Sequence, residues 1–223
     1  MKSQDWHNLA ARLQAALGVK TEPIAISVSN AEAVGADAPK VQAGCMFWDR
    51  ASHGAFSTTA DDHSGCSIGS YTHGLISLAQ AAQTDDVNAL LETGWVEGPD
   101  LAKTASLADR PGAIAYSPLA KAAFAPAAVL VRLDMEALMI LADACPELEM
   151  VGKPQCQIVP LAIDAGRVVA SFGCAVSRTR TGMKRGETTC AIPGDQLADV
   201  LQRLEEVATA GDAAARVAQL PSS

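Results

Sequence analysis

The chain has 223 residues, of which 49% are hydrophobic and 19% charged, and its formal net charge is −8. This composition is that of a globular protein with enough apolar residues for a sizeable core. The acidic balance argues against a nucleic-acid-binding protein, which needs a basic face to neutralise phosphates. The aromatic fraction of only 4% also leaves few platforms for base stacking.

The sequence contains no stretch that approaches the roughly 20 apolar residues needed to span a bilayer. Residues 1–7 hold no apolar core of the kind found in signal peptides. We therefore expect a cytoplasmic protein without membrane contact. In a reducing cytosol, the six cysteines are expected to be free, catalytic or metal-bound rather than disulfide-linked.

The hydrophobic pattern predicts a mixture of helices and strands. Apolar residues at helical spacing predict a helix over residues 5–17 that ends at Gly18, and alternating apolar residues predict a strand over 23–28. Further predicted strands lie at 55–59, 113–116, 128–133, 168–172 and 187–192. Further predicted helices lie at 71–82, 87–92, 101–108, 135–144 and 196–208. Residues 156–165 fit a short helix or a strand equally well.

The order of these elements bears on the fold class. Strands and helices are mixed without a regular β-α-β alternation, and no repeat of fixed period is present. The pattern predicts an α+β (mixed α/β) fold, in which residues 1–210 form a single compact domain with a mixed sheet flanked by helices. Residues 211–223 are small and polar, and we expect them to form a loosely ordered C-terminal tail.

Four cysteines lie in similar, turn-like surroundings: Cys45, Cys66, Cys156 and Cys174. Gly65 and Gly69 lie on either side of Cys66, and Gly173 precedes Cys174. Such turns let backbone N–H groups point at a sulfur and stabilise its thiolate form. We predict that the four thiols converge on one metal centre, a 4Fe-4S iron–sulfur cluster, with structural zinc as the alternative. Spacing alone is a weak signal, because the chain holds no close Cys-x-x-Cys pair.

The other two cysteines have different surroundings. Cys145 ends a predicted helix before a proline, and Cys190 lies within a strand-like stretch. Both are expected in the core. The same interpretation stays open for each of the four others, because free cysteine is among the most buried residue types.

Two further residues are candidates for catalysis. His63, three residues before Cys66, could ligate a metal, donate a hydrogen bond to a cluster sulfur or shuttle a proton; it could equally be a loop histidine with a backbone partner. Arg178, four residues after Cys174, could pair with the charge of a thiolate-bound cluster or hold a substrate carboxylate. A local basic patch is either a solvated loop or a contact for a small anion or a partner, and it consists of Arg178, Arg180, Lys184 and Arg185.

In their order along the chain, these features resemble the family catalogued as domain of unknown function 169, which occurs in bacteria and archaea. The matching features are Pro-Ile-Ala-Ile at 23–26, Cys45, Asp-His-x-x-Cys-x-x-Gly at 62–69, Pro118-Leu119, Cys156 and Gly-Cys-x-x-x-Arg at 173–178. Ser67 and Ala175 depart modestly from the family pattern. The resemblance runs from about Leu13 to the last predicted helix and implies that Cys145 and Cys190 lie outside the pattern. It implies no reaction.

The sequence leaves several classes of function open. The first is a cytoplasmic iron–sulfur protein with a redox or electron-transfer role on a small molecule or a redox partner protein, which would make it an oxidoreductase. The second is an enzyme in which Cys66 or Cys174 is the nucleophile and His63 the base, or a small-molecule-binding module without a cluster. The third is an interaction module whose cysteines fill the core. A homo-oligomer is compatible with all three.

Overall fold

The structure is a computed structural model that describes residues 5–29, 35–41 and 43–219. Its helices are α1 (Trp6–Leu17), α2 (Gly44–Ala51), α3 (Ser67–Thr72), α4 (Leu78–Ala81), α5 (Asp85–Glu92), α6 (Gly98–Lys103), α7 (Met135–Ala144), α8 (Ile158–Ile163), α9 (Ala175–Thr181) and α10 (Leu197–Ala218). Its strands are β1 (Ile24–Ser29), β2 (Phe56–Thr58), β3 (Ala113–Pro118), β4 (Ala128–Leu133), β5 (Glu149–Val151), β6 (Val169–Ser171) and β7 (Thr188–Pro193). Within the described ranges, no helix has the length and apolarity needed to cross a membrane.

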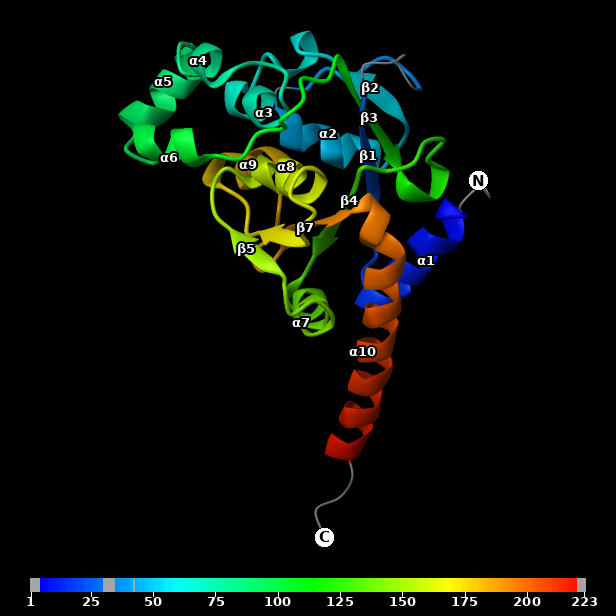
Figure 1. Ribbon diagram of the computed structural model, residues 1–223. Helices are drawn as coiled ribbons and strands as arrows, with labels where there is room; N and C mark the ends of the chain where they lie inside the picture. The colour runs from blue at the N-terminus through cyan, green and yellow to red at the C-terminus, as the bar shows by residue number, and fades with distance from the viewer. Residues whose placement is uncertain (1–4, 30–34, 42, 220–223) are drawn as a thin grey trace.

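The described strands form one mixed sheet in the order β2-β3-β1-β4-β7-β6-β5 (Figure 1). Neighbouring strands are antiparallel, except that β5 and β6 are parallel. Ile24 on the central strand β1 lies opposite Pro118 on β3 and Leu130 on β4. This arrangement is the α+β fold with a helix-flanked mixed sheet that the sequence predicts.

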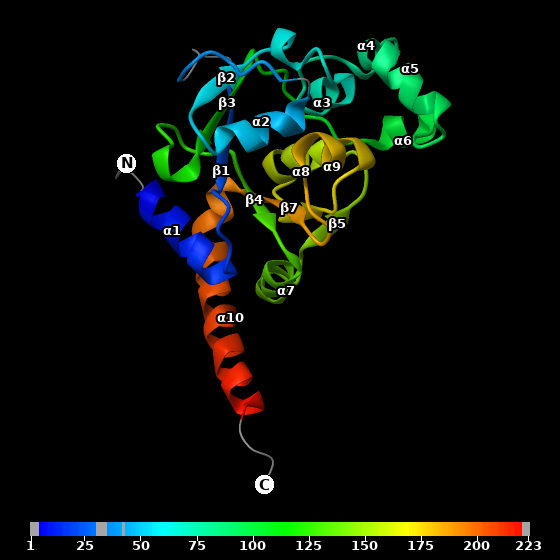
Figure 2. The same cartoon turned by 180° about the vertical axis from the view of Figure 1, so that it is seen from behind.

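Helices cover both faces of the sheet, and the central strands are apolar on both sides for that reason. On β4, Val129 and Val131 point into a core with α1, α7 and α10, whereas Ala128 and Leu130 point into a second core with α2 and α8. Figures 1 and 2 show the two groups of helices on opposite sides of the strands, with α4, α5 and α6 extending beyond α3. The candidate site lies on the α2 and α8 side.

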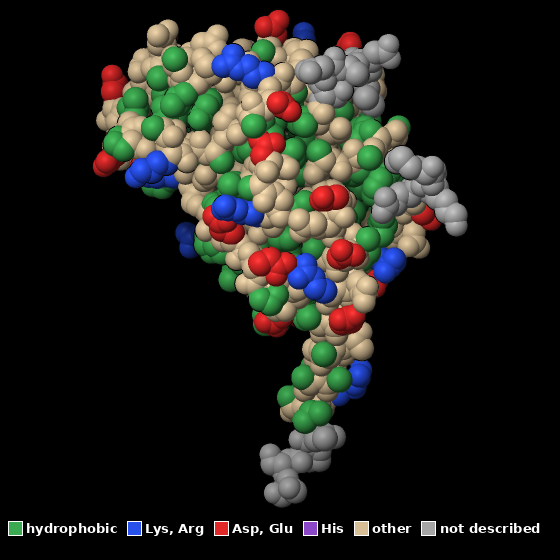
Figure 3. Space-filling model, viewed as in Figure 1, with side chains coloured by type: hydrophobic (Ala, Val, Ile, Leu, Met, Phe, Trp, Pro, Cys, Tyr) green, Lys and Arg blue, Asp and Glu red, His purple; other side chains and the backbone are tan. Residues whose placement is uncertain are grey.

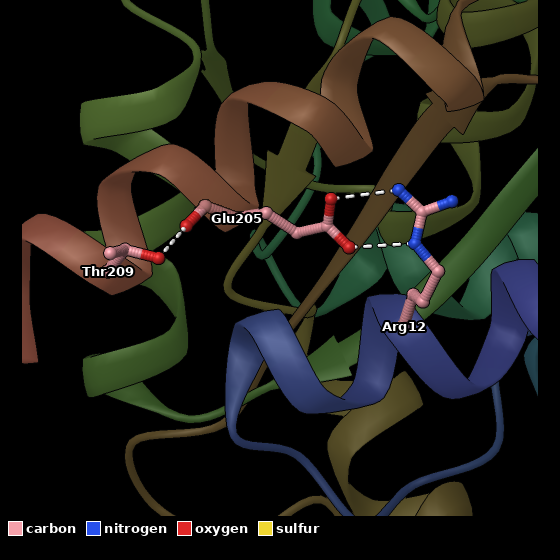
Figure 4. Close-up of polar contacts among 3 residues, drawn as sticks. All are labelled: Arg12, Glu205 and Thr209. Atoms are coloured by element: carbon pink, nitrogen blue, oxygen red, sulfur yellow. Dashed lines mark hydrogen bonds and ion pairs between the residues drawn. The ribbon is translucent and has the colours of Figure 1, made fainter.

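The two ends of the fold meet where α1 packs against α10. Leu13 and Leu204 are fully buried in their shared core. At the surface above them, Arg12 donates two hydrogen bonds to the Glu205 carboxylate, at 2.7 Å and 2.8 Å (Figure 4). The final helix is longer than the predicted 196–208, because it runs on to Ala218 and projects from the body (Figure 1).

Several element boundaries differ from the sequence prediction. The helix predicted over 71–82 is wrong: α3 ends at Thr72, the chain turns at Gly74 with φ of +70°, and α4 begins only at Leu78. A Cβ atom at Gly74 would lie 2.7 Å from the Asp109 carbonyl oxygen, so tertiary packing imposes the turn. The helix predicted over 101–108 instead spans Gly98–Lys103.

The short helices and strands of the structure can also be compared with the sequence prediction. Residues 158–163 are helical, which decides between the two structures that fitted 156–165. Strand β5, only three residues long, was not predicted, and neither were the helices α2 and α9. The helix over 135–144 and the strand over 128–133 are confirmed at their predicted bounds.

Candidate functional site

The four cysteines singled out from the sequence line one pocket, which has a cavity volume of about 70 Å³. They come from four separate segments. Cys45 lies in the first turn of α2, Cys66 directly before α3, and Cys174 directly before α9. Cys156 lies in the short 3-10 turn that leads into α8. Helix α2 packs against α3, α9 and this turn, and that packing brings the four segments together.

Backbone amides and glycines shape the surroundings of two of the thiols. The Ser177 N–H donates to the Cys174 sulfur at 3.3 Å. The preceding Gly173 has a φ of +82°, and a Cβ there would lie 3.0 Å from Arg178 Cγ. A Cβ at Gly69 would lie 3.3 Å from the Cys66 sulfur. The glycines noted in the sequence therefore leave room for the sulfurs and for the turn that presents Cys174.

The thiols influence one another electrostatically. Burial raises the pKa of Cys45 to about 12, and repulsion from Cys66 and Cys174 adds to this. Burial, followed by repulsion from Cys66, raises the pKa of Cys156 well above its usual range. Burial also raises the pKa of Cys66, although a hydrogen bond from the Gly69 N–H and the charge of Arg180 act in the opposite direction. Without a cation, the thiols of Cys45, Cys66 and Cys156 are therefore protonated near neutral pH.

Much of the remaining pocket wall is apolar, and its large apolar side chains are Ile68, Leu90, Trp95, Val96, Leu101 and Val176. Several come from α5, α6 and the loop between them, a region where hydrophobic side chains gather on the surface (Figure 3). Lys153 contacts the apolar wall at Trp95. Its ammonium donates a hydrogen bond to the Trp95 carbonyl oxygen and lies 4.6 Å from the centre of the Trp95 ring. The pocket thus has thiols on one side and an apolar wall on the other.

His63 lies outside the set of pocket-lining residues. Its ring is fully buried, with Nε2 2.8 Å from Thr58 Oγ1 and Nδ1 without a hydrogen-bond partner. It packs on Phe47 and on His73, at ring-centre distances of 4.7 Å and 5.4 Å. The residue is tied to the site only through its backbone, because its carbonyl oxygen accepts from the Cys66 N–H.

Arg178 also lies outside the pocket lining, and its guanidinium is occupied by backbone. It donates to the carbonyl oxygens of Phe172, Lys184 and Glu187, and so holds the loop before β7. The arginine that does line the pocket is Arg180, which lies two residues further along α9. Sequence reasoning named Arg180 only as part of the basic patch, and no local motif distinguishes it from Arg178.

The two remaining cysteines lie on the other side of the sheet. Cys145 and Cys190 are fully buried in the core that α1, α7 and α10 cover, as their sequence context indicated. Among the residues that the structure describes, no group of three or more His, Cys, Asp or Glu side chains is placed to hold a metal ion. The four pocket cysteines therefore share one cavity without converging on a single point.

Comparison with known families adds one finding. The sequence pattern of DUF169, described as "Uncharacterised ArCR", matches residues 12–203. The chain belongs to the DUF169 family. The match includes every residue that lines the pocket of this DUF169 protein. The comparisons with curated proteins and with solved structures found no match.

Proposed function

We propose that this DUF169 protein binds one 4Fe-4S cluster through Cys45, Cys66, Cys156 and Cys174 and has a redox or electron-transfer role in the cytoplasm. The observation that carries the proposal is that all four thiols line one pocket although they come from four distant segments. Thiolates are soft ligands that suit iron–sulfur clusters, and four cysteines are the usual ligand set of such a cluster. Bound iron would also offset the burial and the mutual repulsion that raise the pKa values of Cys45, Cys66 and Cys156.

A cluster and a structural zinc ion place different demands on the four sulfurs. A single zinc ion needs its four sulfurs about 2.3 Å from one point. In a 4Fe-4S cluster each cysteine binds a different iron, so the four sulfurs lie further apart. The shared pocket supports a common metal centre in either form, and metal analysis decides between the two.

Each part of the pocket has a role in this proposal. The cluster, when bound, supplies one-electron transfer. The Ser177 and Gly69 N–H groups donate to two of its cysteine sulfurs, and hydrogen bonds of this kind raise a cluster's reduction potential. The apolar wall around Trp95 limits the access of water. The open mouth leaves a path for a small molecule or for a redox partner protein.

The alternative of a cysteine nucleophile receives less support. A nucleophilic cysteine needs a lowered pKa and a base within hydrogen-bond reach. The pKa of Cys66 is raised by burial, and the proposed base His63 has its pKa lowered by burial and is hydrogen-bonded to Thr58 instead. Core filling is also less well supported, because Cys45, Cys66 and Cys174 are only half-buried.

The test is anaerobic expression and reconstitution with iron and sulfide, followed by visible absorption spectroscopy and metal analysis. We expect a brown protein with about four iron and four sulfide per chain. A colourless protein without iron after reconstitution would contradict the cluster. Zinc bound at about one per chain would replace it with the structural alternative.

A further inference from the structure

Beside the thiols, the pocket contains a buried side chain with an unused polar atom. Gln155 lines the pocket and is only 3% exposed. Its Nε2 donates to Thr189 Oγ1 at 2.8 Å, which fixes the amide group, whereas its Oε1 has no partner. A buried oxygen without a hydrogen bond is unfavourable, so this position is suited to a ligand that donates a hydrogen bond.

The same pocket is lined by Arg180, whose positive charge has only a weak hydrogen-bond partner. Arg180 is half-buried, and its one hydrogen bond is a long contact of 3.4 Å to the Gly65 carbonyl oxygen. None of the ion pairs formed among the described residues involves it. An arginine fork pairs best with a carboxylate or phosphate.

The other charged groups on the pocket do not compensate Arg180. Lys153 is held against Trp95 by its carbonyl oxygen and its ring. Asp100 lines the pocket from α6, but it is exposed, so solvent screens its charge. Apart from the four cysteines, the charged lining residues Asp100, Lys153 and Arg180 sum to one positive charge, and Arg180 also acts electrostatically on the sulfurs of Cys45 and Cys66.

We propose that this pocket binds a small organic acid with an apolar body, whose carboxylate pairs with Arg180 and whose hydroxyl group is hydrogen-bonded to Gln155. The apolar body lies against the wall formed by Trp95, Val96 and Leu101. A hydroxyl group suits Gln155, because it can donate to the amide oxygen. The inference rests on the proposed function, since the acid would bind beside the four cysteines and be the small substrate of the redox role.

The test uses three related probes: 2-hydroxyisovalerate, its uncharged amide, and isovalerate, which lacks the hydroxyl group. Binding to the cluster-loaded protein is measured by calorimetry, and iron content is measured in every sample. We expect the hydroxy acid to bind at least about tenfold more tightly than either analogue, since each analogue lacks one of the two polar contacts.

Two variants assign the contacts. In Arg180→Met, the hydroxy acid and its amide should bind equally; in Gln155→Leu, the hydroxy acid and isovalerate should bind equally. Arg216→Met, which removes the same charge from the exposed far end of α10, should bind the probes as wild type does.

The outcomes separate this inference from the proposed function. Loaded protein that binds the acid and its amide with equal affinity, or binds no probe, overturns the inference and leaves the cluster intact. The inference is also overturned if Arg180→Met lowers the cluster's reduction potential and leaves the binding of the acid unchanged, because the arginine then pairs with the cluster's own charge. Protein that cannot be loaded with iron contradicts the proposed function instead.

Discussion

At the scale of single residues, two buried histidines lie behind the cysteine pocket. His63 and His73 are fully buried with ring centres 5.4 Å apart. The His73 Nδ1–H donates to the Gly69 carbonyl oxygen at 2.8 Å, and its Nε2 has no partner. Burial lowers the pKa of His73 to about 4 and that of His63 well below its usual range. Both rings are therefore neutral at pH 7, so no charge is buried at either position.

The histidine pair predicts a loss of stability in acid. As pH falls from about 6.5 to about 4, the unfolded chain takes up protons at these histidines and the folded chain does not, so the free energy of unfolding falls. His73 alone should contribute roughly 3 kcal/mol of this loss. Urea unfolding of iron-free protein across this range should therefore show a shallower pH dependence in His73→Gln than in wild type.

A matched control is His53→Gln, which removes an exposed histidine and should leave the wild-type slope. Equal slopes in all three proteins would show that His73 is protonated in the folded state.

The sequence allowed the choice of cysteines but not of their neighbours. Glycine turns distinguish Cys66 and Cys174 from Cys190 because those turns are visible locally. Arg180 and Gln155 carry no such mark, since they face the pocket only because of how α9 and the 155–157 turn pack. Their contribution depends on tertiary contacts that no local pattern encodes.

At the scale of elements, α10 is held by its first half only. Leu197, Leu201 and Leu204 are fully buried against α1 and the sheet, whereas Val217 is 67% exposed. Figures 1 and 2 show the second half of α10 projecting from the body. Apolar residues at helical spacing made the first half predictable. The second half is rich in alanine, a strong helix former, and it extends the helix without packing.

This division of α10 predicts unequal effects of trimming its side chains. Leu204→Ala should lower the free energy of unfolding by about 2–5 kcal/mol, because it leaves a cavity between α10 and α1. Val217→Ala, at the exposed end, should leave it nearly unchanged. Urea denaturation measures both. A similar loss in the two variants would mean that the projecting half of α10 is packed against something in solution.

At the scale of the whole molecule, the fold brings together residues that are far apart in the chain. Cys45 and Cys174 lie 129 residues apart in the chain (174 − 45) and line one pocket because α2 packs against α9. The order of the predicted strands and helices indicated a mixed sheet flanked by helices. It could not predict which loops meet, because that depends on the strand order β2-β3-β1-β4-β7-β6-β5. Loading with iron should accordingly stabilise the domain as a unit.

The most direct test of the account is the iron and acid-labile sulfide content of single cysteine variants after anaerobic reconstitution. Replacing Cys45, Cys66, Cys156 or Cys174 by serine should lower the content far below that of wild type, because each cysteine holds one corner of the cluster. Cys190→Ser, in the opposite core, should load as wild type does. Circular dichroism of each variant checks that it is folded. Full loading of a folded variant of any of the four, or equal loss in Cys190→Ser, would contradict the account.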